Sequence, residues 1–216
     1  MKYGIYFIFL LSLNGFAQIQ VHEEPLHHPV FRNENARILD VIAHPNDTSL
    51  IHQHSYNYCY VTIDGGKIWV ENKGEDGRTL ELPVGFTGGY FENPQQPLVH
   101  RFANRSDGLI RLIAIENLTH GNTKDSIHPL LTNEELLINN HQFLVTKISL
   151  SPSQQLDFHS TLNTIIVNTG QTPLSVNIKS EELADWRWLN AGSQISIYNQ
   201  ETINVSIVLV GLKSSD

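Results

Sequence analysis

The chain has one cysteine, few positive charges and no long apolar run beyond its first residues. Cys59 is the only cysteine among 216 residues, so no disulfide can form within the chain and the fold must depend on a hydrophobic core. Lys and Arg total 14 against 22 Asp and Glu, a formal charge of −8, which excludes the basic surface that nucleic-acid binding needs. We therefore expect no nucleic-acid partner. Because no later run is long and apolar enough, we also expect no membrane span.

The first 17 residues have the layout of a cleavable secretory signal. Lys2 supplies a positive charge, residues 5–13 form a short apolar run, and Gly15 and Ala17 are the small residues that a signal peptidase reads. The run is too short to cross a bilayer as a helix. We expect residues 1–17 to be a signal peptide of bacterial type and the mature protein to be secreted or periplasmic.

Abundant β-branched residues and short alternating runs predict an all-β fold. Turn signals such as Asp64-Gly65-Gly66 and Thr169-Gly170 separate the runs. Many short strands at this spacing are typical of a sandwich or a barrel. The expected strands are residues 37–43, 58–63, 67–71 and 109–116 in the first half, and 143–150, 164–168, 174–178, 194–198 and 203–209 in the second.

The two halves of the chain are related. Residues 33–41 precede a proline, and His52 follows that proline by seven positions; residues 140–148 and His159 repeat this arrangement. The segments lie 107 positions apart without a gap, which favours an internal duplication. Between the halves, Thr132 begins a capping-box pattern that predicts a short linker helix near 132–138.

Histidine is abundant, and one pair stands out among the eleven. His52 and His54 are separated by one residue at the start of a β-rich run. Because strand side chains alternate, both imidazoles should project from one face, and neutral imidazoles so placed suit a transition metal. We expect solvated or structural roles for the others: His22, His27 and His28 in a polar arm, His120 and His128 in the connection, and His44, His141 and His159 near strands.

A second pattern extends this pair. Pro97 is followed by His100 and Asn104, which form H-x-x-x-N. Together with H-x-H at His52 and His54, the sequence resembles the cupin superfamily. The resemblance implies a double-stranded β-helix barrel of the RmlC-like jelly-roll type. It also implies that His52, His54 and His100 bind a divalent transition metal: Fe, Mn, Ni or Zn.

The glutamate of the first cupin motif is missing. Tyr58 stands at its position and shares a strand face with His54. We favour packing inside the barrel for this phenol, followed by hydrogen bonding to a substrate and last by direct ligation, so Tyr58 is a candidate catalytic residue. In the next register Cys59 would be a thiolate ligand, but alternation turns it to the other face, where a small buried apolar role is favoured.

The resemblance covers residues 30–117 well and extends in weaker form over 138–212. Thr161 stands where a second histidine would be, and residues 195–199 contain no histidine. We therefore expect a bicupin, with a metal-binding cupin domain at 18–128 and a degenerate, metal-free one at 129–216. Trp186 and Trp188 are expected in the core, with sugar stacking as the alternative.

Three histidines leave coordination positions open, which is typical of a catalytic metal. The first hypothesis is a metal-dependent enzyme of dioxygenase, lyase or isomerase type that acts on a small organic molecule. The alternatives are a non-catalytic cupin that binds a small molecule or carbohydrate, and a protein of the cell envelope that retains the ion itself. The chain is expected to be a monomer or a homodimer. Arg37 and Arg101 are expected in surface salt bridges, with pairing to an anionic substrate as the alternative.

Overall fold

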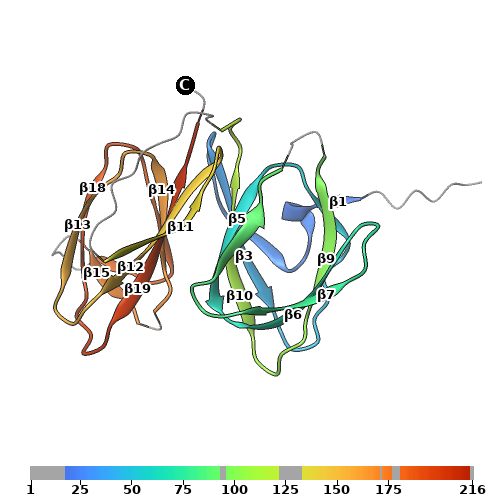
Figure 1. The fold of residues 1–216 in the computed structure, drawn as a ribbon, viewed down its shortest axis with the longest axis horizontal. Helices are drawn as coiled ribbons and strands as arrows, with labels where there is room; N and C mark the ends of the chain where they lie inside the picture. The colour runs from blue at the N-terminus through green and yellow to red at the C-terminus, as the bar shows by residue number, and fades with distance from the viewer. Residues whose placement is uncertain (1–17, 93–95, 122–132, 171, 177–180, 215–216) are drawn as a thin grey trace, which may run out of the picture.

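The computed structural model describes residues 18–92, 96–121, 133–170, 172–176 and 181–214, which form two β-barrels side by side (Figure 1). The all-β prediction and the two-barrel layout are confirmed. The expected signal segment, residues 1–17, lies outside the described residues. None of the described helical residues belongs to a helix long and apolar enough to cross a membrane.

The N-terminal barrel consists of two five-stranded sheets. The first has the order β1-β4-β9-β6-β7 and the second β2-β3-β10-β5-β8. Their bounds are β1 Ile19–Gln20, β4 His52–His54, β9 Leu98–Asn104, β6 Gly66–Asn72 and β7 Arg78–Leu82, then β2 His27–Arg32, β3 Ala36–Ala43, β10 Ile110–Asn117, β5 Tyr58–Asp64 and β8 Thr87–Tyr90. A short 3-10 helix, η1 (Val21–Glu23), lies between β1 and β2.

Over its described residues, the C-terminal barrel repeats this plan with one strand fewer. Its sheets have the orders β11-β12-β19-β14-β17 and β13-β18-β15-β16. The bounds are β11 Glu134–Asn139, β12 Phe143–Leu150, β19 Val205–Leu212, β14 Asn163–Asn168 and β17 Trp186–Leu189, then β13 Gln155–His159, β18 Gln194–Tyr198, β15 Leu174–Val176 and β16 Glu181–Leu183.

The duplication is visible in the strands and in their corners. β3 and β12 have equal length and lie 107 positions apart. At the entrance to β3 the Asn33 side-chain oxygen accepts from two backbone N–H groups, including that of Ala36. Asn140 does the same at the entrance to β12, where Phe143 is the equivalent donor. The chain therefore turns into both barrels by the same local hydrogen bonding.

The linker helix near 132–138 was a wrong prediction over the described part of that segment. Residues 134–139 form β11, which pairs antiparallel with the edge of β12. Leu137 and Ile138 also pack against the core. Because an open sheet edge supplies a whole row of hydrogen bonds, strand pairing outweighs a local capping pattern. Thr132, at the start of that pattern, lies outside the described residues.

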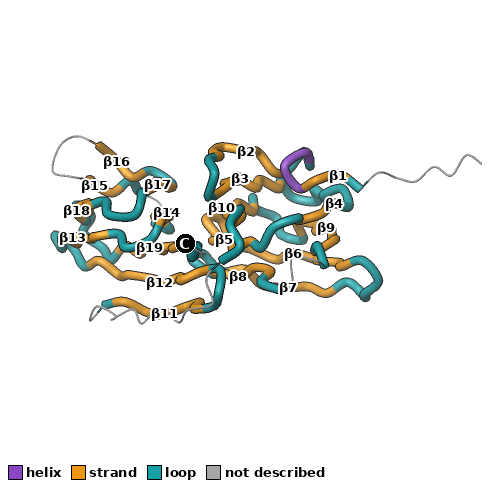
Figure 2. The backbone as a smooth tube through the Cα atoms, turned by 90° about the horizontal axis from the view of Figure 1, so that it is seen from above, coloured by secondary structure: helices purple, strands orange, loops and turns teal. Residues whose placement is uncertain are grey.

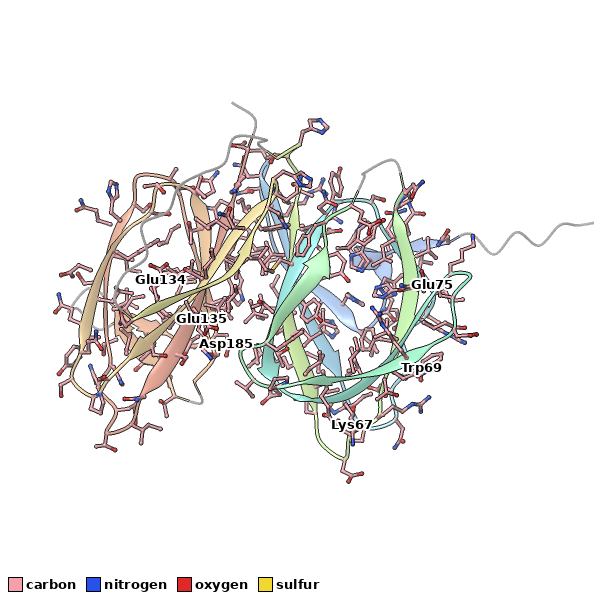
Figure 3. All side chains as sticks on the ribbon, in the orientation of Figure 1. Lys67, Trp69, Glu75, Glu134, Glu135 and Asp185 are labelled. Carbon is pink, nitrogen blue, oxygen red and sulfur yellow. The ribbon has the colours of Figure 1, made fainter. Side chains whose placement is uncertain are left out.

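Each barrel has its own hydrophobic core, and a further core cluster joins the two barrels. The sheet that contains β3, β5 and β10 lies against the sheet that contains β12, β14 and β19, as two perpendicular views show (Figures 1 and 2). Fully buried side chains from both sheets form a single cluster, and Trp186 and Trp188 pack at its margin, which agrees with a core role. Arg111 contacts Asp40 of its own barrel and Asp185 of the other at 2.8 and 2.9 Å, and Figure 3 labels Asp185 where the barrels meet.

Candidate metal centre

Two adjacent strands bring the three predicted histidines together. β4 pairs antiparallel with β9, and this register places His52 directly opposite His100. His52 and His54 both project into the barrel, as strand alternation predicted, and all three side chains are buried. The Nε2 atoms of His54 and His100 are 3.1 Å apart, and the ring centroids of His52 and His100 are separated by 4.5 Å.

The structure adds a fourth histidine that sequence reasoning placed in solvent. His27, on β2, is 6% exposed, and its ring lies 4.6 Å from that of His52. One ring nitrogen each from His27, His52 and His54 lies within 4.8 Å of the others. The expectation of a solvated arm is therefore wrong for His27, whereas the next residue, His28, is exposed. The arm is drawn inward because β2 pairs along β3, with His27 opposite Val41.

The spacing of these nitrogens suits one metal ion. Two imidazole nitrogens about 2.1 Å from an ion would lie about 3.0 Å apart at an octahedral angle and about 3.4 Å apart at a tetrahedral one. The His54 and His100 Nε2 atoms, 3.1 Å apart, fall within this range. Nε2 of His52 is buried and has no hydrogen-bond partner among the described residues, and one ring nitrogen of His52 lies within 4.8 Å of one from His54.

Burial keeps these imidazoles neutral and so able to bind a metal. Desolvation, followed by the neighbouring His27, lowers the pKa of His52 to about 4. Desolvation also lowers the pKa of His54 and of His100 well below the ordinary value, and the adjacent histidines act in the same direction. A neutral imidazole keeps one nitrogen lone pair, whereas a protonated one has none.

In His52 and His27, the Nδ1 ring nitrogen is held by a protein group. Nδ1 of His52 donates to the Leu50 carbonyl at 2.9 Å. Nδ1 of His27 lies 2.6 Å from the Glu24 carboxylate. The other Glu24 oxygen accepts from the Leu50 N–H at 3.1 Å, so one carboxylate supports both histidines. Such outer partners fix the orientation of metal-binding imidazoles.

A second carboxylate lies behind His54. Glu116, on β10, is fully buried, and its Oε1 is 4.0 Å from Nδ1 of His54, with neither atom otherwise hydrogen-bonded among the described residues. Its Oε2 accepts from Arg37 at 2.9 Å, so the surface role expected for Arg37 is wrong. Desolvation raises the pKa of Glu116 to about 7 against the opposing effect of Arg37.

Glu24 and Glu116 were missed in the sequence. Glu116 had a signal, because it is a lone charge directly after the apolar residues 112–115. A charged residue directly beside such an apolar run indicates a buried group with a partner. Glu24 and His27 had none, since they lie in a short polar segment outside both motifs.

Tyr58 and Cys59 point in opposite directions. The Tyr58 ring stacks on His54 with centroids 4.0 Å apart, so the packing role is present beside the histidines. Burial, followed by the nearby Tyr60, raises the pKa of Tyr58, so its phenol stays protonated. Cys59 is fully buried in the core between the barrels, as alternation predicted, and its thiol cannot reach the histidines.

A cavity of about 190 Å³ opens beside the histidines within the barrel. Its wall is largely apolar, and the side chains that give it polar character include those of Tyr58, Tyr60, Tyr90, Asn72 and Arg78. His54 and His100 form part of the same wall. A small organic molecule in this space would lie directly against the candidate metal centre.

The second barrel does not rebuild the centre. His159, the counterpart of His52, is exposed and lies opposite Gln194, and Thr161 is exposed as well. In the described part of this barrel, no group of three metal-ligating side chains comes together. The residues that form the candidate centre therefore all lie in the N-terminal barrel.

Comparison with known proteins shows the fold. No family model and no curated protein matches the sequence. The structure is similar to that of AerE from Microcystis aeruginosa (11% identity, 88% of this chain and 98% of that one, TM-score 0.62). It is also similar to that of the bacterial pirin YhhW from Escherichia coli in complex with nickel(II) (14% identity, 88% of this chain and 91% of that one, TM-score 0.62). A third similar structure is a salicylate 1,2-dioxygenase from Pseudaminobacter salicylatoxidans (10% identity, 82% of this chain and 71% of that one, TM-score 0.57). The chain thus has the two-barrel cupin fold.

Proposed function

We propose that this protein binds one divalent transition metal through His52, His54 and His100 and acts as a metal-dependent enzyme on a small organic molecule. The observation that carries the proposal is a cluster of buried, neutral imidazoles beside a cavity, with the His54 and His100 Nε2 atoms 3.1 Å apart and one ring nitrogen of His52 within 4.8 Å of one from His54. Two proteins of similar structure support it: the pirin YhhW, which was solved with nickel(II), and the salicylate 1,2-dioxygenase. The signal-like residues 1–17 support a location outside the cytoplasm.

The bound ion would polarise an oxygen of the substrate or, if it is iron, provide a site for oxygen chemistry of the dioxygenase class. The chain's own residues would do the rest. The apolar wall, which includes Ile68 and Leu112, excludes water and limits the substrate to a small molecule. Tyr58, held protonated by burial, can donate a hydrogen bond to a bound oxygen atom.

A non-catalytic cupin that binds a small molecule is the second candidate. The observation that favours it is that, over the described residues, no carboxylate joins the three histidines as a ligand, since Glu116 lies behind His54. Three neutral imidazoles would then hold the metal, and a bound ligand's oxygens would contact it in the cavity. Turnover separates the two candidates, because a binding protein returns its ligand unchanged.

The first test is the metal content of purified protein and of two variants. We expect about one equivalent of metal in the wild type and its loss in His52→Ala, because a buried nitrogen ligand is removed. His44→Ala is the matched control, since His44 is exposed. Elemental analysis measures both. A wild type without bound metal after incubation with Fe(II), Mn(II), Ni(II) and Zn(II) would contradict the proposal.

The second test is turnover. The loaded protein is incubated with small phenols, hydroxy acids and keto acids that fit the cavity, and oxygen uptake and products are followed. Product formation that disappears in His52→Ala and persists in His44→Ala supports the enzyme. Metal binding and ligand protection without product across the panel would leave the binding cupin as the function.

A further inference from the structure

We infer that His27 is a fourth ligand of the proposed centre, so that metal binding fastens the amino-terminal segment, residues 19–32, to the barrel. The inference rests on the proposed function but uses residues outside both histidine motifs. His27 belongs to the set of nitrogens within 4.8 Å that also includes His52 and His54. Its ring is buried between those of His52 and Phe102.

The His27 side chain is held in the orientation that a ligand needs. Its Nδ1 contacts Glu24 at 2.6 Å, which leaves Nε2 as the nitrogen available to an ion. Glu24 itself is 2% exposed, and its two oxygens also accept from the backbone N–H groups of Leu26 and Leu50 at 2.8 and 3.1 Å.

The amino-terminal segment also pairs with β4, the strand that carries two of the other proposed ligands, His52 and His54. β1 pairs parallel with β4, with Ile19 opposite His52 and Gln20 opposite Gln53. β2 then joins the opposite sheet through β3. His27 thus connects the two sheets of the barrel across the candidate centre, and the Leu50 peptide joins Glu24 to His52. An ion bound by His27 and His52 would therefore link β2 to β4, the strand with which β1 pairs.

The test compares Co(II) and Ni(II) binding in four proteins. Glu24→Gln is expected to weaken metal affinity about 10- to 100-fold, as removal of an outer partner does, and His27→Ala to weaken it by a larger factor. His27→Ala should still bind metal and should change the visible absorption bands of the Co(II) form. His28→Ala, an exposed neighbour on the same strand, is the matched control and should resemble the wild type.

A dissociation constant for His27→Ala within twofold of that for His28→Ala, with unchanged Co(II) bands, would overturn the inference and leave the three-histidine proposal standing. Failure of the wild type to bind either ion would overturn both. If His27→Ala does not fold, hydrogen exchange in the wild type decides. Ni(II) should then slow exchange at residues 19–32 at least tenfold relative to the metal-free protein, and unchanged rates there would overturn the inference.

Discussion

A buried carboxylate needs a partner, and Glu116 has Arg37. Both side chains are almost completely buried, and Arg37 also reaches His22 at 2.7 Å. Buried pairs of this kind are costly to break from one side, because the remaining charge loses its partner without regaining water. Removing either partner should therefore destabilise the barrel behind His54.

Replacing Arg37 by Met should lower the free energy of unfolding by about 3 kcal/mol at pH 8, because Glu116 would be left charged without its partner or forced to take up a proton. Urea denaturation measures the change. Arg101→Met is the control: its pair with Glu71 is 40% and 33% exposed, as the sequence predicted, and its loss should cost less than about 1 kcal/mol. Equal effects of the two substitutions would contradict the prediction.

Residue by residue, the sequence predicted what local spacing determines. His52, His54 and His100 came from two motifs, and the turning of Cys59 away from them came from strand alternation. His27 and Glu116 reach the site through pairings between strands, and Glu24 reaches it through its contact with His27. Their places in the site depend on tertiary structure, and only Glu116 has a local signal, as a lone charge directly after an apolar run.

Among the elements, the loops that follow β9 and β18 are held by hydrogen bonds from buried asparagine side chains. Asn199, at the end of β18, is fully buried, and its side-chain amide donates to the carbonyls of Leu150, Ser151 and Ile203. Its oxygen accepts from the Glu201 N–H. Asn104, at the end of β9, makes the same kind of contacts in the other barrel, with Ala43, Gly108 and Ser106.

Asn199→Ala should lower the free energy of unfolding by about 2–3 kcal/mol, because several buried carbonyls lose a donor. Thermal and urea denaturation measure it. Asn190→Ala, at an exposed position, is the control and should change stability by less than about 0.5 kcal/mol. A loss at Asn199 no greater than that at Asn190 would show that water replaces the amide.

Strand positions were easier to predict than the element between the halves. The expected strands 143–150 and 194–198 coincide with β12 and β18, because buried strands carry regular apolar patterns bounded by turns. The expected helix became β11, because a capping signal says nothing about a free sheet edge nearby. The error follows from judging a segment by its local propensity alone.

For the whole molecule, the core between the barrels sets stability. Phe143 is fully buried there and packs edge-on against Phe91 of the N-terminal barrel, with ring centroids 5.7 Å apart. Cys59 lies in the same cluster, where desolvation raises the pKa of its thiol. A thiol of this kind reacts only once the core opens.

Phe143→Ala should therefore destabilise both barrels together, by about 3–5 kcal/mol, in a single transition. Labelling of Cys59 by a disulfide reagent should follow the same transition seen by circular dichroism. Ile203→Ala, at a side chain that is 67% exposed, is the control and should leave both unchanged. Two separate transitions, or fast labelling of the native wild type, would show that the barrels open independently.

The shared core also has an internal symmetry. Ala36 and Ile38 of β3 lie in one cluster with Phe143 and Val145 of β12, their counterparts 107 positions later. Ile113 and Ile115 of β10, which pairs with β3, lie there with Val208 and Val210 of β19, which pairs with β12. Equivalent strands thus pack against each other within one chain, as they do across the self-complementary interface of a homodimer. A single barrel separated from the other would leave this apolar face uncovered.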